Sequence, residues 1–377
     1  MMENNDVMPD AGKSASVENI TPAAETRRAV DADMAVFALD VGTRTIAGVV
    51  GTREDDGFRI IAAETYEHDG RVMYDGQIHD IGAVAKAVAI VRDRLEAKAG
   101  FRLGAVYTAA AGRALKTVKV ETAMRIPPGR EIDDAFIKGL EACALKAARE
   151  AADRDAAPEG GGFAFVGGAI TRMYLDGYRI ISLSGHRGEQ ASVEFLAAFL
   201  PNAVTASLRS VMKRAGLEVA GITLEPMAAL NAVAARANRH LNLALADVGA
   251  GTTDIAVTKD GALFGCSMVS FAGDNVTDCI SHRFLTDFRT GEAIKYAIYE
   301  GKGEIWYDDI FNRRFSVAYD EAHQAIKPVV AELAHKIAAA ILDCNKKAPE
   351  AVIIAGGGCR LPGLADGIAA NRQAWNF

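Results

Sequence analysis

Two aspartate–glycine turns form an internal repeat and are the residues of this chain best suited to chemistry. The first copy reads Leu39-Asp-Val-Gly-Thr-Arg-Thr-Ile-Ala, and the second reads Ala246-Asp-Val-Gly-Ala-Gly-Thr-Thr-Asp-Ile-Ala. Each aspartate ends an apolar run typical of a buried strand, and a returning strand follows the hydroxyl residues. Such a turn offers backbone N–H groups and hydroxyls beside a carboxylate, so it suits a polyphosphate that shares its charge with a divalent cation. Asp-x-Gly turns are common in hairpins, but their duplication favours a shared ligand cleft between two similar units.

A third glycine-rich stretch, Ala351-Val-Ile-Ile-Ala-Gly-Gly-Gly-Cys-Arg-Leu-Pro-Gly, follows another apolar run. Three glycines after a buried strand let the backbone approach a flat ligand closely. A dinucleotide fold would need G-x-G-x-x-G and an acidic residue about 20 residues later. Instead, Leu361 stands where the last glycine should be, and only a short stretch follows Gly358. The sequence contains neither the P-loop pattern GxxxxGK[ST] nor the GxSxG elbow of many hydrolases.

Length and composition describe an ordinary globular chain. It has 377 residues, of which 50% are hydrophobic and 24% charged, enough for two or three domains with sizeable cores. The formal net charge of −7 argues against a dedicated nucleic-acid binder, which needs a basic face. The 5 cysteines are odd in number and form no CxxC pair, so neither a disulfide framework nor a zinc site is expected. The sequence shows neither a transmembrane-length apolar run nor a signal peptide, which favours a cytoplasmic protein.

The spacing of apolar residues predicts the elements that position the three glycine stretches. Strands are expected on both sides of the two repeated turns and directly before the third stretch, and also at 104–112, 164–180, 189–201 and 217–224. A strand-like stretch is expected at 306–317. Helices are expected at 81–98, 131–152, 203–215, 275–285, 291–298, 320–345 and 364–370, with one more that opens at Pro226.

These elements divide the chain into five segments. Residues 1–33 lack aromatic residues and are rich in Asp, Glu, Asn, Ala and Ser, which predicts a disordered tail. The first ordered unit spans 34–120, and one helix with antiparallel strands makes 121–201 an inserted subdomain. Residues 202–240 return to the first unit, and 241–377 form the second, similar unit.

Taken together, these stretches resemble the motifs of the actin-like ATPases, a superfamily that includes actin, DnaK-type chaperones, sugar kinases and the bacterial division protein FtsA. Asp40-Val-Gly-Thr resembles the first phosphate motif, and Asp247-Val-Gly-Ala-Gly-Thr-Thr-Asp resembles the second. Leu224-Glu-Pro-Met-Ala-Ala-Leu and the helix around Leu364–Ala370 resemble the two connecting helices. Ile354-Ala-Gly-Gly-Gly-Cys-Arg-Leu is similar to the adenosine motif. The resemblance covers everything after the tail and implies an α/β, duplicated actin-like (ribonuclease H-like) ATPase fold.

Within the superfamily, the chain most resembles FtsA. Ser270-Phe-Ala-Gly-Asp-Asn-Val-Thr-Asp resembles the FtsA loop after the second phosphate hairpin, and Gly291-Glu-Ala-Ile-Lys resembles the segment that contacts adenine and ribose. The unit at 121–201 lies where FtsA carries its distinctive subdomain, so an inserted FtsA-type subdomain is expected. The type IV pilus protein PilM shares this layout and is the second candidate. A DnaK-type chaperone would need a downstream substrate-binding domain, and a sugar kinase would need a catalytic aspartate and a sugar pocket in the first unit.

The resemblance implies ATP and Mg²⁺ as cofactors and gives particular residues a role. Asp40 and Asp247 would orient the magnesium-bound waters, and Glu225 would help to polarise the attacking water, so Glu225 and Asp247 are the expected catalytic residues. The expected cofactor-binding residues are Asp40, Gly42, Thr43, Arg44, Thr45, Asp247, Gly249, Gly251, Thr252, Thr253, Gly273, Asp274, Glu292, Lys295, Gly356, Gly357, Gly358, Arg360 and Leu361.

Three of these assignments have a purely structural alternative. Arg44 would then be an exposed turn residue without contacts. Glu292 and Lys295 would form a solvated helix face. Glu225 would only interact with a helix N-terminus, where a carboxylate is favoured.

The resemblance implies an ATP-binding cytoskeletal adaptor for cell division that self-assembles in a nucleotide-dependent way and hydrolyses ATP weakly. Its expected partners are further copies of the chain and either a tubulin-like division protein or a pilus membrane partner, but not nucleic acid. FtsA ends in an amphipathic membrane helix, whereas 371–377 is too short for one. The second unit is therefore expected to be truncated at its C-terminal end, and recruitment to the inner face of the cell membrane would depend on a partner.

Overall fold

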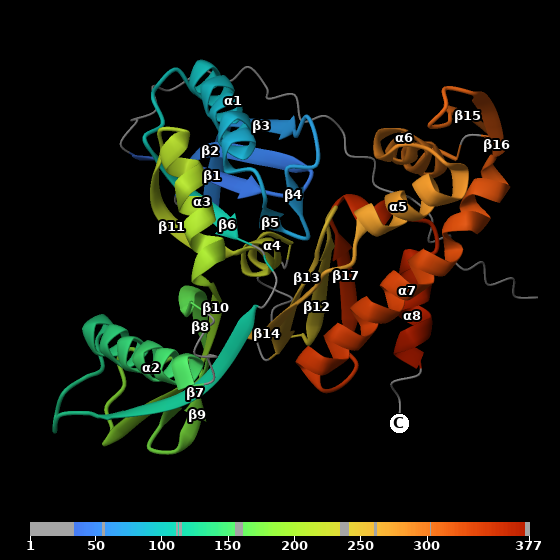
Figure 1. Ribbon diagram of the computed structural model, residues 1–377. Helices are drawn as coiled ribbons and strands as arrows, with labels where there is room; N and C mark the ends of the chain where they lie inside the picture. The colour runs from blue at the N-terminus through green and yellow to red at the C-terminus, as the bar shows by residue number, and fades with distance from the viewer. Residues whose placement is uncertain are drawn as a thin grey trace, which may run out of the picture.

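The computed structural model of this protein describes residues 34–54, 57–110, 112, 115–154, 161–233, 241–259, 262–301 and 303–373. The expected tail at 1–33 lies outside this described part. Figure 1 shows two α/β halves that face each other and a smaller unit that extends from the first half.

The first half is built on a five-stranded sheet with the order β11-β6-β1-β2-β3. Its antiparallel meander consists of β1 (Ala35–Val41), β2 (Thr45–Glu54) and β3 (Gly57–Glu67). β6 (Ala105–Ala110) and β11 (Glu218–Leu224) run parallel to β1. Helices α1 (Ile81–Ala99) and α3 (Asn202–Arg214) pack against each other on this sheet, and α3 also contacts the small ribbon of β4 (Met73–Tyr74) and β5 (Gln77–Ile78). Because β1 is the central strand, Asp40 near its end lies in the middle of the sheet.

Local sequence explains how α1 covers the sheet. Asp80 precedes the helix, and its side chain accepts a hydrogen bond from a first-turn N–H group. Gly100 ends the helix in the left-handed conformation with φ 84°, where glycine carries no Cβ penalty. The buried face consists of Val84, Ala85, Ala87, Val88, Val91 and Leu95, which recur at helical spacing.

The second half repeats this plan around a four-stranded sheet with the order β14-β13-β12-β17. β12 (Leu243–Val248), β13 (Thr253–Lys259) and β14 (Ala262–Val269) form an antiparallel meander, and β17 (Ala351–Ala355) runs parallel to β12. β12 therefore corresponds to β1, and the sequence repeat is also a structural repeat.

Four helices and a hairpin complete the second half. They are α5 (Gly273–Phe284), α6 (Phe288–Tyr299), the hairpin of β15 (Glu304–Asp308) and β16 (Arg314–Ala318), α7 (Tyr319–Asn345) and α8 (Leu364–Gln373). The expected strand at 306–317 is thus two short strands, joined by a turn. α6 begins earlier than the expected residue 291, because Asp287 caps it by accepting a hydrogen bond from the Thr290 N–H group.

A separate four-stranded sheet with the order β7-β10-β8-β9 forms the smaller unit. Its elements are β7 (Lys116–Arg125), α2 (Asp134–Arg154), β8 (Phe163–Leu175), β9 (Tyr178–Ile180) and β10 (Gln190–Pro201). α2 packs on the sheet and helps to bury a hydrophobic core of its own, which includes Phe136, Leu140, Phe195 and Phe199. β7 begins ahead of 121, the boundary expected from the sequence.

Helix α4 (Glu225–Val233) lies between the two large sheets (Figure 1). It contacts β6 and β11 of the first half and β12, β13 and β14 of the second half. This helix therefore joins the two halves below the ends of β1 and β12. Within the described residues, no helix is long and apolar enough to cross a membrane.

Candidate functional site

A cleft with a volume of about 450 Å³ lies between the two halves. Both repeated turns, the start of α4, one face of α6 and the third glycine stretch line it. The sequence-predicted residues in its lining are Asp40, Gly42, Thr43, Arg44, Thr45, Glu225, Asp247, Gly249, Thr252, Gly273, Glu292, Lys295, Gly356, Gly357, Gly358 and Arg360. Residues from at least five separate parts of the sequence thus meet at one concave site, as in most small-molecule sites.

Four predicted site residues lie behind this lining. A Cβ atom on Gly251 would lie 2.7 Å from Thr43 Oγ1, so Gly251 packs the second turn against the first. Thr253 is fully buried, and its hydroxyl donates to a backbone carbonyl at 2.9 Å. Leu361 belongs to the hydrophobic core of the second half. Asp274 forms an ion pair with an arginine of the first half. These four residues therefore act on the cleft through the residues that line it.

The two repeated turns are closed by equivalent backbone hydrogen bonds. The Gly42 N–H group donates to the Thr45 carbonyl at 3.0 Å, and the Gly249 N–H group donates to the Thr252 carbonyl at 2.9 Å. A Cβ atom would lie 2.9 Å from the Thr45 oxygen at Gly42 and 3.1 Å from the Thr252 oxygen at Gly249. Both turns are therefore too tight for a side chain at the glycine, which keeps the backbone directly accessible from the cleft.

Three carboxyl groups, those of Asp40, Glu225 and Asp247, line the cleft, and a fourth, that of Asp254, is buried close to them. Burial and the nearby charge of Asp247 raise the pKa of Asp40 to about 6. Burial, followed by the charges of Asp40, Asp254 and Asp247, raises the pKa of Glu225 well above its ordinary value. Burial also raises the pKa of Asp247, and it raises that of Asp254 to about 7. Burial and the charges of Asp40, Asp247 and Asp254 thus destabilise the ionised carboxylates of this cluster, so the site favours either protons or a cation.

This donor set fits a hydrated divalent cation. Asp40 Oδ1 is buried and has no hydrogen-bond partner, although buried polar atoms normally find one. Within the described chain, no three His, Cys, Asp or Glu side chains form a direct metal cage. Mg²⁺ usually keeps several of its waters and binds through one or two carboxylates. Asp40 and Asp247 are the residues that would hold such a hydrated ion.

The third glycine stretch packs closely beside Asp247. Gly356 has φ 79°, and a Cβ atom there would lie 2.4 Å from both Asp247 Oδ1 and the Val248 carbonyl oxygen. At Gly358 a Cβ atom would lie 2.4 Å from Val248 Cγ1. The 3-10 turn that follows β17 therefore requires glycine at both positions, and its backbone lines the cleft on the side of the second half.

Buried polar side chains line the cleft along α6. Lys295 Nζ donates to Glu292 Oε2 at 3.0 Å, to Thr277 Oγ1 at 2.8 Å and to the Gly273 carbonyl at 3.1 Å. Burial lowers the pKa of Lys295, although Glu292 opposes the shift. Burial acts to raise the pKa of Glu292, but Lys295 and Arg44 hold it below its ordinary value. The alternative of a solvated helix face is thus wrong for this pair.

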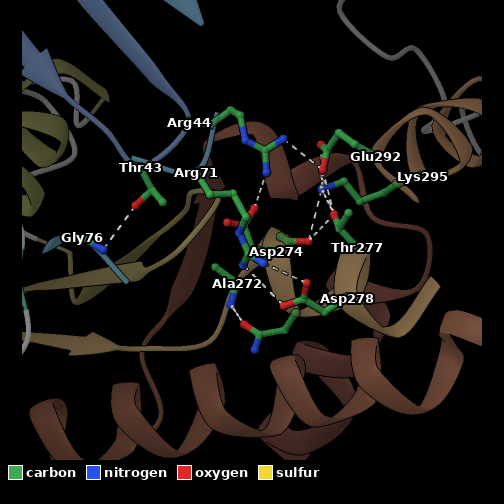
Figure 2. A network of polar contacts seen from close by, with 12 residues as sticks. Thr43, Arg44, Arg71, Gly76, Ala272, Asp274, Thr277, Asp278, Glu292 and Lys295 are labelled. Carbon is green, nitrogen blue, oxygen red and sulfur yellow. Dashed lines mark hydrogen bonds and ion pairs between the residues drawn. The ribbon is translucent and has the colours of Figure 1, made fainter. Parts of the chain in front are cut away.

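Arg44 reaches from the first turn across the cleft. Its guanidinium lies 2.5 Å from Asp274 Oδ1 and 3.0 Å from Glu292 Oε2 (Figure 2). The alternative of an exposed turn residue without contacts is therefore wrong. Glu225 is the first residue of α4 and also lines the cleft. Its position is therefore compatible both with polarising a water molecule and with an interaction at the helix N-terminus.

Sequence reasoning missed several residues of the cleft. Tyr296 and Tyr299 line it, with ring centroids 5.7 Å apart, and the Arg360 guanidinium lies 5.2 Å from the Tyr299 ring. Their spacing from Glu292 on one face of α6 is a signal that could have identified them. Asp254 stands inside the second motif, but its position on the buried strand β13 concealed its part in the carboxyl cluster.

Comparison with known proteins finds relatives among the FtsA proteins, although no family model matches the chain. The chain is 28% identical over 268 residues to cell division protein FtsA of Pseudomonas aeruginosa, which covers 69% of this chain and 60% of that protein. It is 24% identical over 341 residues to FtsA of Bacillus subtilis, which covers 87% of this chain and 74% of that protein. The match to the Pseudomonas protein thus spans less than two thirds of that relative's length.

A solved structure supports the architecture independently. A chain of the PilM-PilN type IV pilus biogenesis complex aligns with a TM-score of 0.64 at 19% identity, which covers 90% of this chain and 86% of that one. The expectation of a duplicated α/β actin-like fold is confirmed. This chain has the actin-like ATPase fold, and its sequence is similar to those of the FtsA cell division proteins.

Proposed function

We propose that this chain binds ATP with Mg²⁺ in the cleft and acts as an FtsA-like cell division adaptor. The observation that carries the nucleotide proposal is the meeting of two equivalent glycine turns across one cleft, with the buried Asp40 Oδ1 left without a partner. The similarity to FtsA proteins supports the division role.

The two turns would bind the phosphates from opposite sides. Backbone N–H groups of the turns face an anion at short range, as in other phosphate nests. Thr43 Oγ1 accepts a hydrogen bond from the Gly76 N–H group at 3.2 Å, which leaves the Thr43 proton to donate to a phosphate. Thr252 instead donates to Asp254 Oδ2 at 3.1 Å, so its role is to orient that carboxyl group. A bound Mg²⁺ would supply the positive charge that offsets the repulsion between phosphates and carboxylates.

The nucleoside would lie between α6 and the third glycine stretch. Tyr299 and Arg360 present a ring and a planar guanidinium, and both groups stack well on aromatic bases. The Gly356–Gly358 backbone offers a flat surface opposite α6. Glu292 and Lys295 then provide the polar contacts beside the ribose.

Weak hydrolysis follows from the state of Glu225. A carboxyl group orients and deprotonates water well only when it is ionised near neutral pH. The raised pKa of Glu225 makes it a poor base until a cation offsets the neighbouring carboxylates. We therefore propose that nucleotide binding, with slow turnover, governs self-assembly into filaments or smaller oligomers.

Nucleotide binding is tested by titrating a fluorescent ATP analogue with and without Mg²⁺. We expect Asp247→Ala to weaken Mg²⁺-dependent binding at least about 100-fold, which corresponds to about 2.7 kcal/mol. Asp343→Ala is the matched control, because the Asp343 side chain is 89% exposed and lies outside the cleft. Equal affinity of wild type and Asp247→Ala would contradict the proposed site.

Assembly is tested by pelleting the full chain with ATP, with ADP and without nucleotide. Nucleotide-dependent pelleting that Asp247→Ala abolishes supports the adaptor proposal, and the same pelleting under all three conditions opposes it. A PilM-like pilus scaffold is the second candidate, because a chain of the PilM-PilN complex shares the fold over 90% of this chain. Binding to the cytoplasmic peptide of a pilus membrane protein, rather than to the tail of a tubulin-like division protein, would favour that candidate. Either partner would recruit the chain from the cytoplasm to the inner face of the membrane.

A further inference from the structure

Six side chains bridge the two halves at the mouth of the cleft, and we call them the arginine latch. Two arginines come from the first half and four partners from α5 and α6 of the second half. The members are Arg44, Arg71, Asp274, Asp278, Phe288 and Glu292. Figure 2 shows both arginines pointing from the first half toward the carboxylates of the second.

The inner part of the latch is a buried ion pair. The Arg44 guanidinium contacts Asp274 at 2.5 Å and Glu292 at 3.0 Å, and the three side chains are only 18%, 12% and 11% exposed. Separating such a pair leaves charges partly buried without partners, which costs far more than breaking a surface pair. Arg44 and Glu292 also line the cleft, so the inner part borders the bound ligand directly.

The outer part of the latch surrounds one aromatic ring. Phe288, the first residue of α6, has the Arg71 guanidinium 4.2 Å and the Arg44 guanidinium 5.0 Å from its ring centroid. Arg71 also lies 3.3 Å from Asp278 and 4.9 Å from the Tyr74 ring centroid. Both arginines thus share one ring, and the outer contacts support the inner pair. None of Arg71, Asp278 and Phe288 lines the cleft.

The position of the latch determines what it controls. Helix α4 contacts both sheets and joins the halves on one side of the cleft. The latch joins them at the mouth, where side chains of α5 and α6 contact Arg44 of the first turn and Arg71 just before β4. A ligand held between the two turns would therefore have the packed helix α4 on one side and the separable contacts of the latch on the other.

We infer that Arg71 and Phe288 are positioning residues that hold the arginine latch closed, and that the latch must open for a nucleotide to enter or leave. The inference rests on the proposed nucleotide site, since it concerns the exchange rate at that site. It also predicts that the latch restrains the two halves with no nucleotide added, which can be measured separately.

The first experiment measures how fast a fluorescent ATP analogue dissociates from the full chain in Mg²⁺. We expect Arg71→Asp, which places two acids face to face, to speed dissociation about tenfold, equivalent to about 1.4 kcal/mol. Phe288→Leu should have an effect of about fivefold, since it removes the ring but keeps an apolar side chain. Arg71→Asp combined with Asp278→Arg restores the ion pair and should recover part of the loss.

Arg94→Asp is the matched control. Arg94 also pairs with a carboxylate, Glu64 at 3.9 Å, and lies 5.6 Å from the Tyr66 ring centroid, but all three residues belong to the first half. Its replacement should leave the dissociation rate unchanged. Equal rates for Arg71→Asp and Arg94→Asp, with both proteins folded by circular dichroism, would overturn the inference.

The second experiment measures amide hydrogen exchange without nucleotide. Arg71→Asp should increase exchange at the turn around 42–45 and at the start of α6, whereas Arg94→Asp should not. If the chain binds no nucleotide but Arg71→Asp still increases exchange at these sites, the proposed function is refuted and the latch is not. Exchange that is the same in the two variants would refute the latch, whatever the nucleotide result.

Discussion

The two repeated turns share one motif and one closing hydrogen bond, but different structures support them. The second turn is held by backbone: the Gly273 and Asp274 N–H groups at the start of α5 donate to the Gly249 and Ala250 carbonyls at 3.1 and 2.7 Å. The strands beside it, β12 and β13, are buried almost throughout.

The first turn is held by side chains as well as by a backbone hydrogen bond, which the His68 N–H group donates to the Arg44 carbonyl at 3.0 Å. His68 Nε2 donates to the Gly42 carbonyl at 3.2 Å, and Thr43 Oγ1 accepts a hydrogen bond from the β4–β5 ribbon. Its strand β1 is only half-buried, and Arg44 connects the turn to the opposite half. The second turn is thus a platform fixed within its own half by backbone hydrogen bonds, whereas the first also depends on side chains, one of which, Arg44, pairs with the opposite half.

The largest effect is expected from a substitution that disrupts the second turn itself. Gly356→Ala should lower the free energy of unfolding by about 3 kcal/mol and abolish nucleotide binding, because its Cβ would lie 2.4 Å from Asp247 Oδ1 at φ 79°. Gly363→Ala is the control, since Gly363 has φ 82° and nothing within 4 Å of its Cβ, so only the backbone strain of about 1 kcal/mol remains. Denaturant unfolding measures both, and equal losses would remove the argument for a close approach.

An intermediate effect concerns the carboxyl cluster, to which each turn contributes. The pKa values of Asp40 and Asp254 in the folded protein, about 6 and about 7, lie above the ordinary value of 3.8 for an aspartate. A carboxyl group whose pKa is raised on folding destabilises the fold while it is ionised, so the penalty disappears as pH falls through the folded pKa. In EDTA, stability should therefore rise by about 2 kcal/mol between pH 8 and pH 6.

Asp254→Asn separates the contributions of the two turns. It should remove the part of this dependence near pH 7 and leave the part near pH 6, which belongs to Asp40. Saturating Mg²⁺ should flatten the wild-type curve, because a cation replaces the protons. A stability that falls toward pH 5 in EDTA would contradict this account of the cluster.

The smallest expected effect concerns the side-chain support of the first turn. His68→Phe removes the donor to the Gly42 carbonyl and should weaken nucleotide affinity about fivefold, near 1 kcal/mol. His68→Gln keeps a donor and should restore most of the affinity. If both variants bind like the wild type, the turn does not depend on His68.

Local sequence predicted most of the fold. The helix expected at 81–98 appears as α1, and the strands on both sides of each turn appear as expected, because their apolar spacing and caps are local features. The stretch at 306–317 was not predicted as a hairpin, since its turn lacks glycine and proline. The start of α6 was placed too late, because the cap at Asp287 lies outside the apolar pattern.

The sequence by itself determined which residues carry chemistry: two aspartate–glycine turns, a third glycine stretch and the elements that flank them. Only the tertiary structure decided which other residues they contact. Arg44 contacts Asp274 across a separation of 230 positions, the buried Asp254 joins a carboxyl cluster with Asp40, and Tyr299 lines a cleft that the first turn also lines. Periodicity and capping depend on neighbours within a few residues, whereas contacts across the cleft depend on how two separately folded halves pack against α4.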